Sequence, residues 1–347
     1  MNRTERLVRA LRGEPVDAVP IWLMRQAGRH LPGYRELRAQ HEILEIARTP
    51  ALAVEVTLEP LDRFDLDAGV VFADITIPFF GLGVDFQIDA GIGPVIATPV
   101  RTRAAVDGLH AFDAVRDAGF VGGAIRGFRD RRPDRPIIGF AGAPFTLASY
   151  LIEGRPSREF AETRRILNAE PATFVRLLDR LTEVTIDYLR MQAAAGAAAL
   201  QLFDTWVGQL SRRTYESVVL PRLRTLFDAL APLGIPTIYF STGSSHLTDL
   251  AADAHAGALG VDWRTPLGRV RREVGPRIAL QGNLDPTALL TDPDTVRRMA
   301  REVLDELPDG RGHVFNLGHG VPPEARPECV AALVDFVHEY SAARSAA

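Results

Sequence analysis

Eight short apolar segments recur along the chain, and they constrain its fold more than any other feature. Each is a continuous run, rich in β-branched and aromatic residues, that ends in polar or glycine-rich residues. Continuous rather than alternating hydrophobicity is typical of strands that are covered on both faces. The predicted strands are 19–24, 69–74, 136–142, 197–205, 236–242, 258–263, 277–283 and 312–318.

Amphipathic helical patterns lie between most of these segments. The clearest covers residues 176–195, where Leu177, Leu181 and Val184 belong to one broad apolar stripe. Strands that alternate with helices indicate βαβ units and a parallel sheet. Eight such units predict an α/β protein with a single (β/α)8 TIM barrel, and a doubly wound open sheet is the structural alternative. Further helical patterns cover 213–233, 294–307 and 327–343.

Two segments do not fit this repeat. Residues 82–99 contain alternating apolar residues around positions 90–93, which predicts a β-hairpin inserted after the second strand. Residues 25–61, after the first strand, are a mixture of loop and helix. No serine- or proline-rich linker divides the chain. We therefore expect residues 1–347 to form a single barrel domain.

All forty residues counted as lysine or arginine are arginine, so the chain contains no lysine. Without an ε-amino group, the protein cannot form an imine with a substrate carbonyl or with pyridoxal phosphate. The phosphate-binding P-loop is also excluded, because its signature requires a lysine. A compositional preference for arginine explains most of these positions, but it does not restore the missing chemistry.

The net charge of −4 provides no global positive field for nucleic acid. The single cysteine, Cys329, excludes intrachain disulfides and cysteine-rich metal sites, and it suits a reducing compartment. No apolar run approaches the roughly 18 residues of a membrane span. Residues 1–15 lack the apolar core of a secretory signal, so an ordinary first helix is favoured over a basic transit peptide. We expect a cytoplasmic protein that binds neither nucleic acid nor membrane.

Polar residues follow most of the predicted strands at their carboxyl ends, where the loops of a barrel form the active site. Two arginines surround an Ala-Gly pair directly after the first strand. A guanidinium group matches a carboxylate or a phosphate in geometry, so these arginines favour an anionic substrate. The candidate residues are Arg25, Gln26, Ala27, Gly28, Arg29, Asp74, Tyr150, Thr205 and His319.

Each candidate also has a purely structural interpretation. The arginines can form surface salt bridges, and Asp74 can cap the next element. Tyr150 can be an ordinary core tyrosine. His319 lies between two glycines that offer little local packing, which favours a functional role. By contrast, Asp262 and Asp285 have the sequence context of carboxylates that organise loops.

Several motifs are absent from the sequence: HExxH, GxSxG, a GxGxxG after a strand, and a His-x-Cys zinc pair. Neither a metal nor a nucleotide is therefore supported. The residues predict a barrel enzyme without a metal that acts on a carboxylate- or phosphate-bearing substrate. Spacing alone does not name that substrate.

Three motifs are long and specific: RQAGR (25–29), FAGAPFT (140–146) and NLGHG (316–320). With the segments around them, the chain closely resembles the uroporphyrinogen decarboxylase family over nearly its whole length, in the expected order. The matching segments are PIWLMRQAGRHLPGYRELR (20–38), LDAGVVFADITIPFFGLGVDF (66–86), IIGFAGAPFTLASYLIEG (137–154), LQLFDTWVG (200–208), LGVDW (259–263), LQGNLDP (280–286) and FNLGHGVPPEARPE (315–328).

The resemblance implies a (β/α)8 barrel, a homodimer and no cofactor. It also implies the reaction, in which the four acetate side chains of uroporphyrinogen III lose CO2 and become the methyl groups of coproporphyrinogen III. An electron-rich pyrrole supplies its own electron sink for this chemistry, which agrees with a chain that has no lysine. Two alternatives stay open: a corrinoid-linked methyltransferase of the same fold, which needs a zinc site, and a non-catalytic tetrapyrrole carrier.

The resemblance also assigns roles to matching positions. Arg25 and Arg29 resemble arginines that bind substrate carboxylates, with the backbone of Gln26, Ala27 and Gly28 lining the site. Asp74 resembles the carboxylate that accepts hydrogen bonds from the pyrrole N–H groups, and we expect it to stabilise the cationic transition state.

Tyr150, Thr205 and His319 resemble polar groups that position the macrocycle. The chain departs from the family at His30, where many members have tyrosine, and at Thr205, where some have serine. The proton donor stays open, because arginine rarely releases a proton and His319 can instead hold a substrate carboxylate.

Overall fold

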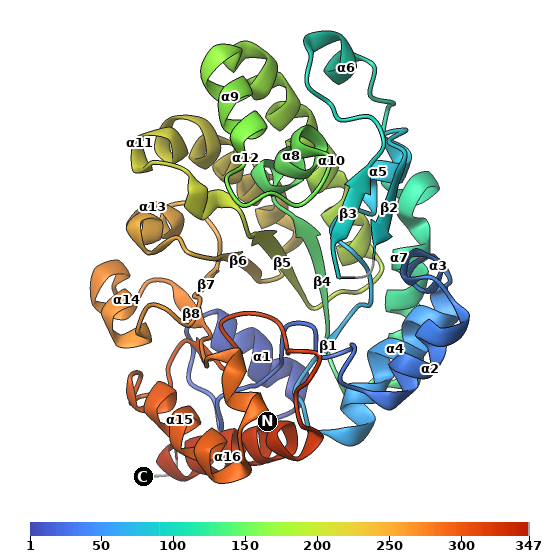
Figure 1. Cartoon of the computed structure of the whole chain (residues 1–347). Coiled ribbons are helices and arrows are strands. Elements are labelled where there is room, and N and C mark those ends of the chain that lie inside the picture. Colours follow the sequence, from blue (N-terminus) through green and yellow to red (C-terminus); the bar gives the residue numbers. More distant parts are fainter. Residues whose placement is uncertain (90, 346–347) are drawn as a thin grey trace.

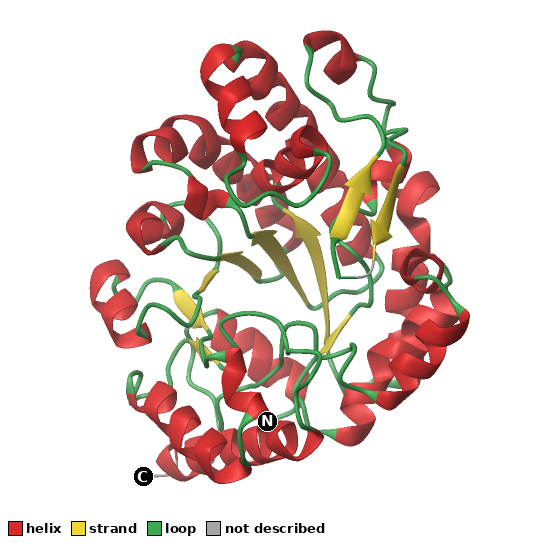
Figure 2. Cartoon of the chain, viewed as in Figure 1, coloured by secondary structure: helices red, strands yellow, loops and turns green. Residues whose placement is uncertain are grey.

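A curled parallel sheet organises the computed structural model, which describes residues 1–89 and 91–345. Its strands follow the order β1–β4–β5–β6–β7–β8–β9, and every neighbouring pair is parallel. Helices surround this sheet on its outside (Figures 1 and 2). The strands are β1 (Gly69–Val70), β4 (Ile137–Gly142), β5 (Ala199–Asp204), β6 (Thr237–Ser241), β7 (Ala258–Gly260), β8 (Ala279–Gln281) and β9 (His313–Val314).

The first predicted strand, residues 19–24, closes the ring between β9 and β1. It forms one parallel bridge, between Ile21 and Phe315. The amide of Phe315 donates to the carbonyl of Pro20 at 2.8 Å, and the amide of Asp67 donates to the carbonyl of Ile21 at 2.9 Å. Pro20 has no N–H to extend the ladder, so this segment is a bridge and not a full strand. The structure confirms a TIM-barrel-like α/β fold.

The strands bury both faces, as their continuous hydrophobicity predicts. Residues of one face, including Ile138, Ala199 and Ile238, fill the inside of the barrel together with Leu7 and Leu11 of α1 (Arg3–Leu11). The α1 helix contacts β8 and β9 and closes the amino-terminal end of the barrel. The carboxyl-terminal end therefore carries the loops that follow the strands.

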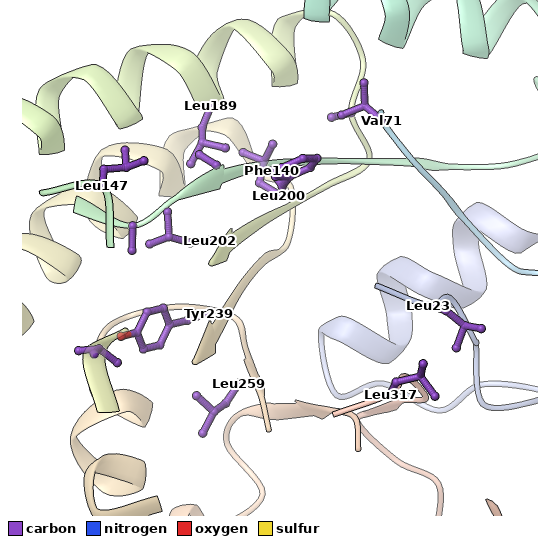
Figure 3. Close-up of a cluster of buried hydrophobic side chains, with 14 of the residues drawn as sticks. Leu23, Val71, Phe140, Leu147, Leu189, Leu200, Leu202, Tyr239, Leu259 and Leu317 are labelled. Atoms are coloured by element: carbon purple, nitrogen blue, oxygen red, sulfur yellow. The ribbon is translucent and has the colours of Figure 1, made fainter. Parts of the chain in front are cut away.

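Alternate residues of the same strands point outward to the helices. Leu200, Leu202 and Tyr239 belong to this outer layer, which also contains Leu189 of α10 (Pro171–Ala194) (Figure 3). The period-two alternation of a strand places neighbours in sequence in two different cores. Two hydrophobic clusters, one inside the sheet and one outside it, hold the barrel together.

The predicted helical patterns all form helices in the structure, with shifted ends. The pattern at 176–195 begins earlier, because Pro171 occupies the first turn of α10. The pattern at 213–233 is divided among α11 (Arg212–Thr214), the π-helix η2 (Tyr215–Val219), α12 (Leu220–Leu230) and the 3₁₀ helix η3 (Ala231–Leu233). Among the described residues, no helix is long and apolar enough to cross a membrane. The outer α-helices are α2 (Pro32–Gln40), α3 (Ile43–Arg48), α4 (Pro50–Arg63), α5 (Pro78–Gly81), α6 (Arg103–Asp107), α7 (Ala114–Arg131), α8 (Pro144–Glu153), α9 (Ala161–Ala169), α10 (Pro171–Ala194), α11 (Arg212–Thr214), α12 (Leu220–Leu230), α13 (Thr248–Ala252), α14 (Leu267–Val274), α15 (Pro293–Asp305) and α16 (Pro327–Ser345). The short 3₁₀ and π helices are η1 (Val207–Gln209), η2 (Tyr215–Val219), η3 (Ala231–Leu233), η4 (Ser245–Leu247) and η5 (Pro286–Leu290).

An antiparallel pair of strands, β2 (Phe86–Asp89) and β3 (Gly93–Ile96), lies between β1 and β4 in the sequence, where a hairpin is predicted. Phe86 pairs with Ile96, and both side chains are buried. Ala90, within the predicted hairpin, lies outside the described residues. The pair extends from the barrel on the side of α5 and α7 (Figure 1).

A buried ion cluster around Asp67 holds the closing segment in place. The Asp67 carboxylate accepts hydrogen bonds from the amide of Ile21 at 2.7 Å, from Arg3 at 2.6 Å and from Arg6 at 2.9 Å. Both arginines bind Oδ1, and the Nε2 atom of His338 lies 2.7 Å from Oδ2, the oxygen that also accepts from Ile21. This one side chain therefore joins α1, α16, β1 and the closing segment. Burial alone raises the pKa of Asp67, but His338 and Arg3 outweigh it and lower this pKa to about 2.

We predict that Asp67→Asn lowers the free energy of unfolding by about 3 kcal/mol, because it leaves buried cations without their partner. The wild-type contribution also depends on pH. The pKa is lower in the folded protein than in the unfolded chain, where it is 3.8. The stabilisation is thus complete above that value and is lost as the pH falls through about 2. Chemical denaturation between neutral and acidic pH measures both effects.

Asp17→Asn is the matched control, since Asp17 pairs with the same Arg6 at 2.7 Å but is 39% exposed. An exposed pair contributes less than about 1 kcal/mol, so this variant should remain near wild-type stability. Equal losses in the two variants would show that the Asp67 cluster does not hold the barrel closed.

Candidate active site

The predicted site residues lie in loops that leave the carboxyl ends of the strands. Arg25 follows the closing segment, Asp74 follows β1, and Thr205 follows β5. Tyr150 lies on α8, directly after β4, and His319 follows β9. Because all these strands are parallel and form a ring, their carboxyl ends meet at one rim. The contacts below bring most of these side chains together.

Arg25 has a left-handed backbone, with φ of 59°, which is rare for a residue with a side chain. Gln26 holds this turn from inside the protein. Its amide donates to the carbonyl of Ala68 at 3.0 Å and accepts from the amide of Leu23 at 2.9 Å. The Gln26 side chain is therefore buried and structural, so only its backbone faces the rim. Residues with such a backbone conformation cluster at functional sites, which agrees with the place of Arg25 at the rim.

Neither Arg25 nor Arg29 has a carboxylate partner among residues 1–89 and 91–345, and both side chains are exposed to solvent. The stem of Arg25 packs against Gly320, where an added Cβ would lie 2.4 Å from its Cδ. Arg25 thus lies beside His319. No hydrogen bond joins Arg29 to another candidate residue within the described chain.

The two carboxylate oxygens of Asp74 have different surroundings, one suited to a structural role and one to a functional role. Its Oδ1 atom accepts hydrogen bonds from the amide of Thr76 at 2.8 Å and from the Thr76 hydroxyl at 2.6 Å. This contact organises the loop after β1. Its Oδ2 atom has no hydrogen-bond partner within the described part of the chain, and the residue is half-buried. One oxygen thus supports the loop while the other is available to a ligand.

Tyr150 stays protonated over the physiological range. Burial, followed by the negative charge of Asp74, raises the pKa of Tyr150 to about 12. The ring packs edge-on against Trp206, with centroids 6.0 Å apart, and Trp206 in turn packs at 4.9 Å against Phe160. Tyr150 is therefore a fixed hydroxyl donor within electrostatic reach of Asp74.

Thr205 sits above a buried hydroxyl network that the sequence does not reveal. The carboxylate of Asp204 accepts hydrogen bonds from Thr146 at 2.7 Å and from Tyr239 at 2.8 Å. Burial raises the pKa of Asp204 to about 6, against the opposing effect of these hydroxyl groups. The Thr146 hydroxyl also accepts from the amide of Trp206 at 3.3 Å. The network joins the start of α8, which carries Tyr150, to the loop that carries Thr205.

His319 is neutral at physiological pH. Burial, together with the charges of Arg25 and Arg264, lowers the pKa of His319 to about 4. Its ring lies edge-on to Trp263, with centroids 6.3 Å apart. A neutral imidazole can donate or accept a hydrogen bond but holds no proton for acid catalysis near pH 7. This environment argues against His319 as the proton donor.

Aromatic side chains lie inside the barrel, next to the carboxyl ends of the strands that form this rim. Phe203, at the end of β5, is half-buried and packs edge-on against Phe140 and Phe240, with centroids 5.5 and 5.8 Å away. The rim therefore combines cations, one available carboxylate oxygen and hydroxyl groups with an apolar floor. Such a site suits a ligand with an apolar ring system and peripheral carboxylates.

The remaining candidates organise loops, as their sequence context predicts. The carboxylate of Asp262 accepts from the amides of Gly243 at 2.6 Å and Arg264 at 2.9 Å, and Asp285 accepts from Thr287 at 2.9 Å. His30 is buried, and burial with nearby arginines lowers the pKa of His30 to about 4. Nothing in its surroundings gives it a role at the rim.

Side chains that can bind a metal ion do not form a group at this rim within the described residues. Within residues 1–89 and 91–345, no three His, Cys, Asp or Glu side chains are grouped to hold a metal ion. Cys329 is buried in α16, and its thiol contacts the carbonyl of Thr291. A cavity of about 390 Å³ lies at the opposite end of the barrel, between Pro15 and α16, and none of the candidate residues lines it.

Comparison with known proteins finds relatives over nearly the whole chain. Residues 2–340 match the family model described as uroporphyrinogen decarboxylase (URO-D). Proteins named uroporphyrinogen decarboxylase from Streptomyces griseus and Syntrophotalea carbinolica are 46% and 47% identical to the chain. These alignments cover 96% and 95% of this chain, and 92% and 96% of the relatives.

A methyltransferase from Methanosarcina mazei shares the fold, with a TM-score of 0.82 over 98% of this chain and 99% of its own. Its sequence identity of 22% supports the fold alone. The family model and the full-length relatives go further. From them, and from the motifs on the barrel rim, we conclude that the chain belongs to the uroporphyrinogen decarboxylase family.

Proposed function

We propose that the protein decarboxylates uroporphyrinogen III to coproporphyrinogen III, a step of porphyrin and heme biosynthesis, and that it needs no cofactor. The observation that carries this proposal is that two cations and one carboxylate oxygen, none of them bound to each other, are available to a ligand at the same rim. Arg25 and Arg29 have no acidic partner within the described residues, and Asp74 keeps its Oδ2 available. The substrate has complementary groups: peripheral carboxylates and central pyrrole N–H donors.

The reaction follows from the electronic properties of a pyrrole. A proton added to a ring carbon produces an iminium-like cation. The bond between the acetate methylene and its carboxylate then breaks, and its electron pair neutralises the ring as CO2 leaves. A second proton converts the resulting methylene to a methyl group, and the ring carbon returns the first. Each acetate therefore consumes one net proton, and no imine to a lysine is required.

In this mechanism Asp74 accepts hydrogen bonds from the pyrrole N–H groups and stabilises the cation as it forms. Electrostatic stabilisation by a preorganised group is usually the largest single contribution to lowering the activation barrier of an enzyme. Arg25 and Arg29 bind carboxylates at the periphery. Tyr150, Thr205 and His319 position the macrocycle by hydrogen bonds, and the backbone of Gln26, Ala27 and Gly28 lines the site.

Release of CO2 from uroporphyrinogen by purified, metal-stripped protein tests the proposed function. We expect four CO2 molecules for each macrocycle consumed. A tetrapyrrole carrier would bind the substrate without releasing CO2. A corrinoid-linked methyltransferase would require zinc and a methyl donor. Absence of CO2 under conditions where the substrate binds would therefore exclude the decarboxylase.

We predict that Asp74→Asn lowers kcat by a factor of about 10² to 10³, which corresponds to roughly 3–4 kcal/mol of transition-state stabilisation. The asparagine keeps an oxygen for the amide of Thr76, so the loop should stay folded. Thr76→Val is the matched control, because it removes a hydroxyl contact but leaves the Asp74 charge. Near-normal turnover by Asp74→Asn would show that this carboxylate is not catalytic.

We predict that His319→Asn lowers kcat/KM by about tenfold at every pH from 6 to 8.5, since one hydrogen bond to a charged group contributes roughly 1.5 kcal/mol. The shape of the pH profile should not change, because His319 is already neutral over that range. His255→Asn, at an exposed histidine beside Asp228, is the control. If instead the pH profile of kcat/KM loses its inflection near pH 7 in His319→Asn, and not in His255→Asn, His319 is the acid.

We further propose, from the family resemblance, that residues 1–347 form one domain and that the protein acts as a homodimer in the cytoplasm. Its substrate is a small molecule, and no nucleic acid or membrane takes part. Light scattering on the purified full-length chain measures the oligomeric state directly.

A further inference from the structure

The proposed function leaves one rim arginine, Arg264, without a role. It follows β7 and lies next to Trp263 and Asp262. Its guanidinium carbon is 3.8 Å from the centre of the Trp263 ring. The same tryptophan packs edge-on against His319 at 6.3 Å. Arg264 therefore belongs to the group of side chains around His319 that also contains Arg25.

Direct contact between two loops fixes this arrangement. Gly318 lies so close to the loop after β7 that an added Cβ would be 2.2 Å from the backbone nitrogen of Trp263. Gly320 leaves similar room for the side chain of Arg25. The two glycines thus place His319 between contacts to Trp263 and to Arg25, and Arg264 rests on that tryptophan.

The guanidinium of Arg264 is held in one orientation, but some of its hydrogen-bond donors stay available. Its Nη1 atom donates to the Asp262 carboxylate at 2.9 Å. Within the described residues, its Nε and Nη2 atoms have no partner, and the side chain is 54% exposed. The Oδ2 atom of Asp262 accepts both this hydrogen bond and one from the amide of Gly243, and its Oδ1 atom accepts from the amide of Arg264. Stacking and one ion pair therefore hold the group in place and leave donors for a further anion.

We propose that Arg264 binds a peripheral carboxylate of the porphyrinogen, one that does not react in that round of decarboxylation, and so contributes to specificity for polycarboxylated substrates. This inference rests on the proposed function. The substrate carries eight carboxylates, while the chain has a net charge of −4, so positive charge must be concentrated at the rim. Arg264 adds to the charge that Arg25 and Arg29 supply.

The test compares steady-state kinetics of Arg264→Gln with those of the wild type on uroporphyrinogen. An interaction made equally in the bound substrate and in the transition state changes KM and leaves kcat unaltered. We expect KM to rise about three- to fivefold, as for a partly exposed ion pair, with kcat unchanged. The product coproporphyrinogen, which retains four carboxylates, should bind more weakly by a similar factor. Arg264→Lys, which keeps the charge, should recover most of the affinity at low ionic strength.

Two further variants separate binding from other effects. Arg269→Gln removes the same charge from an exposed position in α14 and should leave KM unchanged. Asp262→Asn removes the ion pair but keeps an oxygen for the backbone amides of Gly243 and Arg264, so it should raise KM by less than Arg264→Gln, because Trp263 still supports the guanidinium. A purely structural ion pair would make Asp262→Asn and Arg264→Gln equally harmful.

An unchanged KM in Arg264→Gln, or an equal increase in Arg269→Gln, would overturn the inference about Arg264. Neither result would affect the proposed decarboxylation, which wild-type CO2 release establishes separately. Conversely, a wild-type protein that binds uroporphyrinogen without releasing CO2 would exclude the proposed function, and coproporphyrinogen binding would still test Arg264.

Discussion

Closure of the barrel at segment 19–24 is the constraint on which the site depends. This segment has a proline where a ladder amide would be, so its hydrogen bonds to β9 and β1 are few. The buried Asp67 carboxylate compensates by binding the amide of Ile21 and the charged groups of α1 and α16. Because Arg25 follows this segment, the contact at the amino-terminal end of the barrel determines where the arginine lies at the other end.

Three aspartates of the barrel show how environment separates the roles of one residue type. Cations around Asp67 lower its pKa, and its charge is structural. Asp204 is equally buried but has hydroxyl groups where Asp67 has cations, so burial raises its pKa, and it joins two loops of the rim. Asp74 is half-buried and keeps one oxygen free. Position and partners, and not the side chain itself, decide which carboxylate is available for chemistry.

Positive charge is concentrated at the rim in a protein that is acidic as a whole. Burial, and after it the charges of Arg25 and Arg264, lower the pKa of His319 and keep its imidazole neutral. The same charges that suit a polyanionic substrate thus add to the effect of burial in removing His319 from acid catalysis. This coupling explains why a histidine between two glycines, attractive as an acid in the sequence, is better suited to hydrogen bonding.

The sequence by itself determined the barrel class, the family and most of the rim. Continuous apolar runs, helical periodicity and long motifs are local signals, and the structure confirms the fold they predict. Only the tertiary structure decided the rest. The reduction of the first strand to a bridge, the Asp67 cluster with His338, the hydroxyl network under Thr205 and the grouping of Arg264 with His319 join residues far apart in the chain. Burial and pKa values also depend on such distant neighbours, which no local pattern encodes.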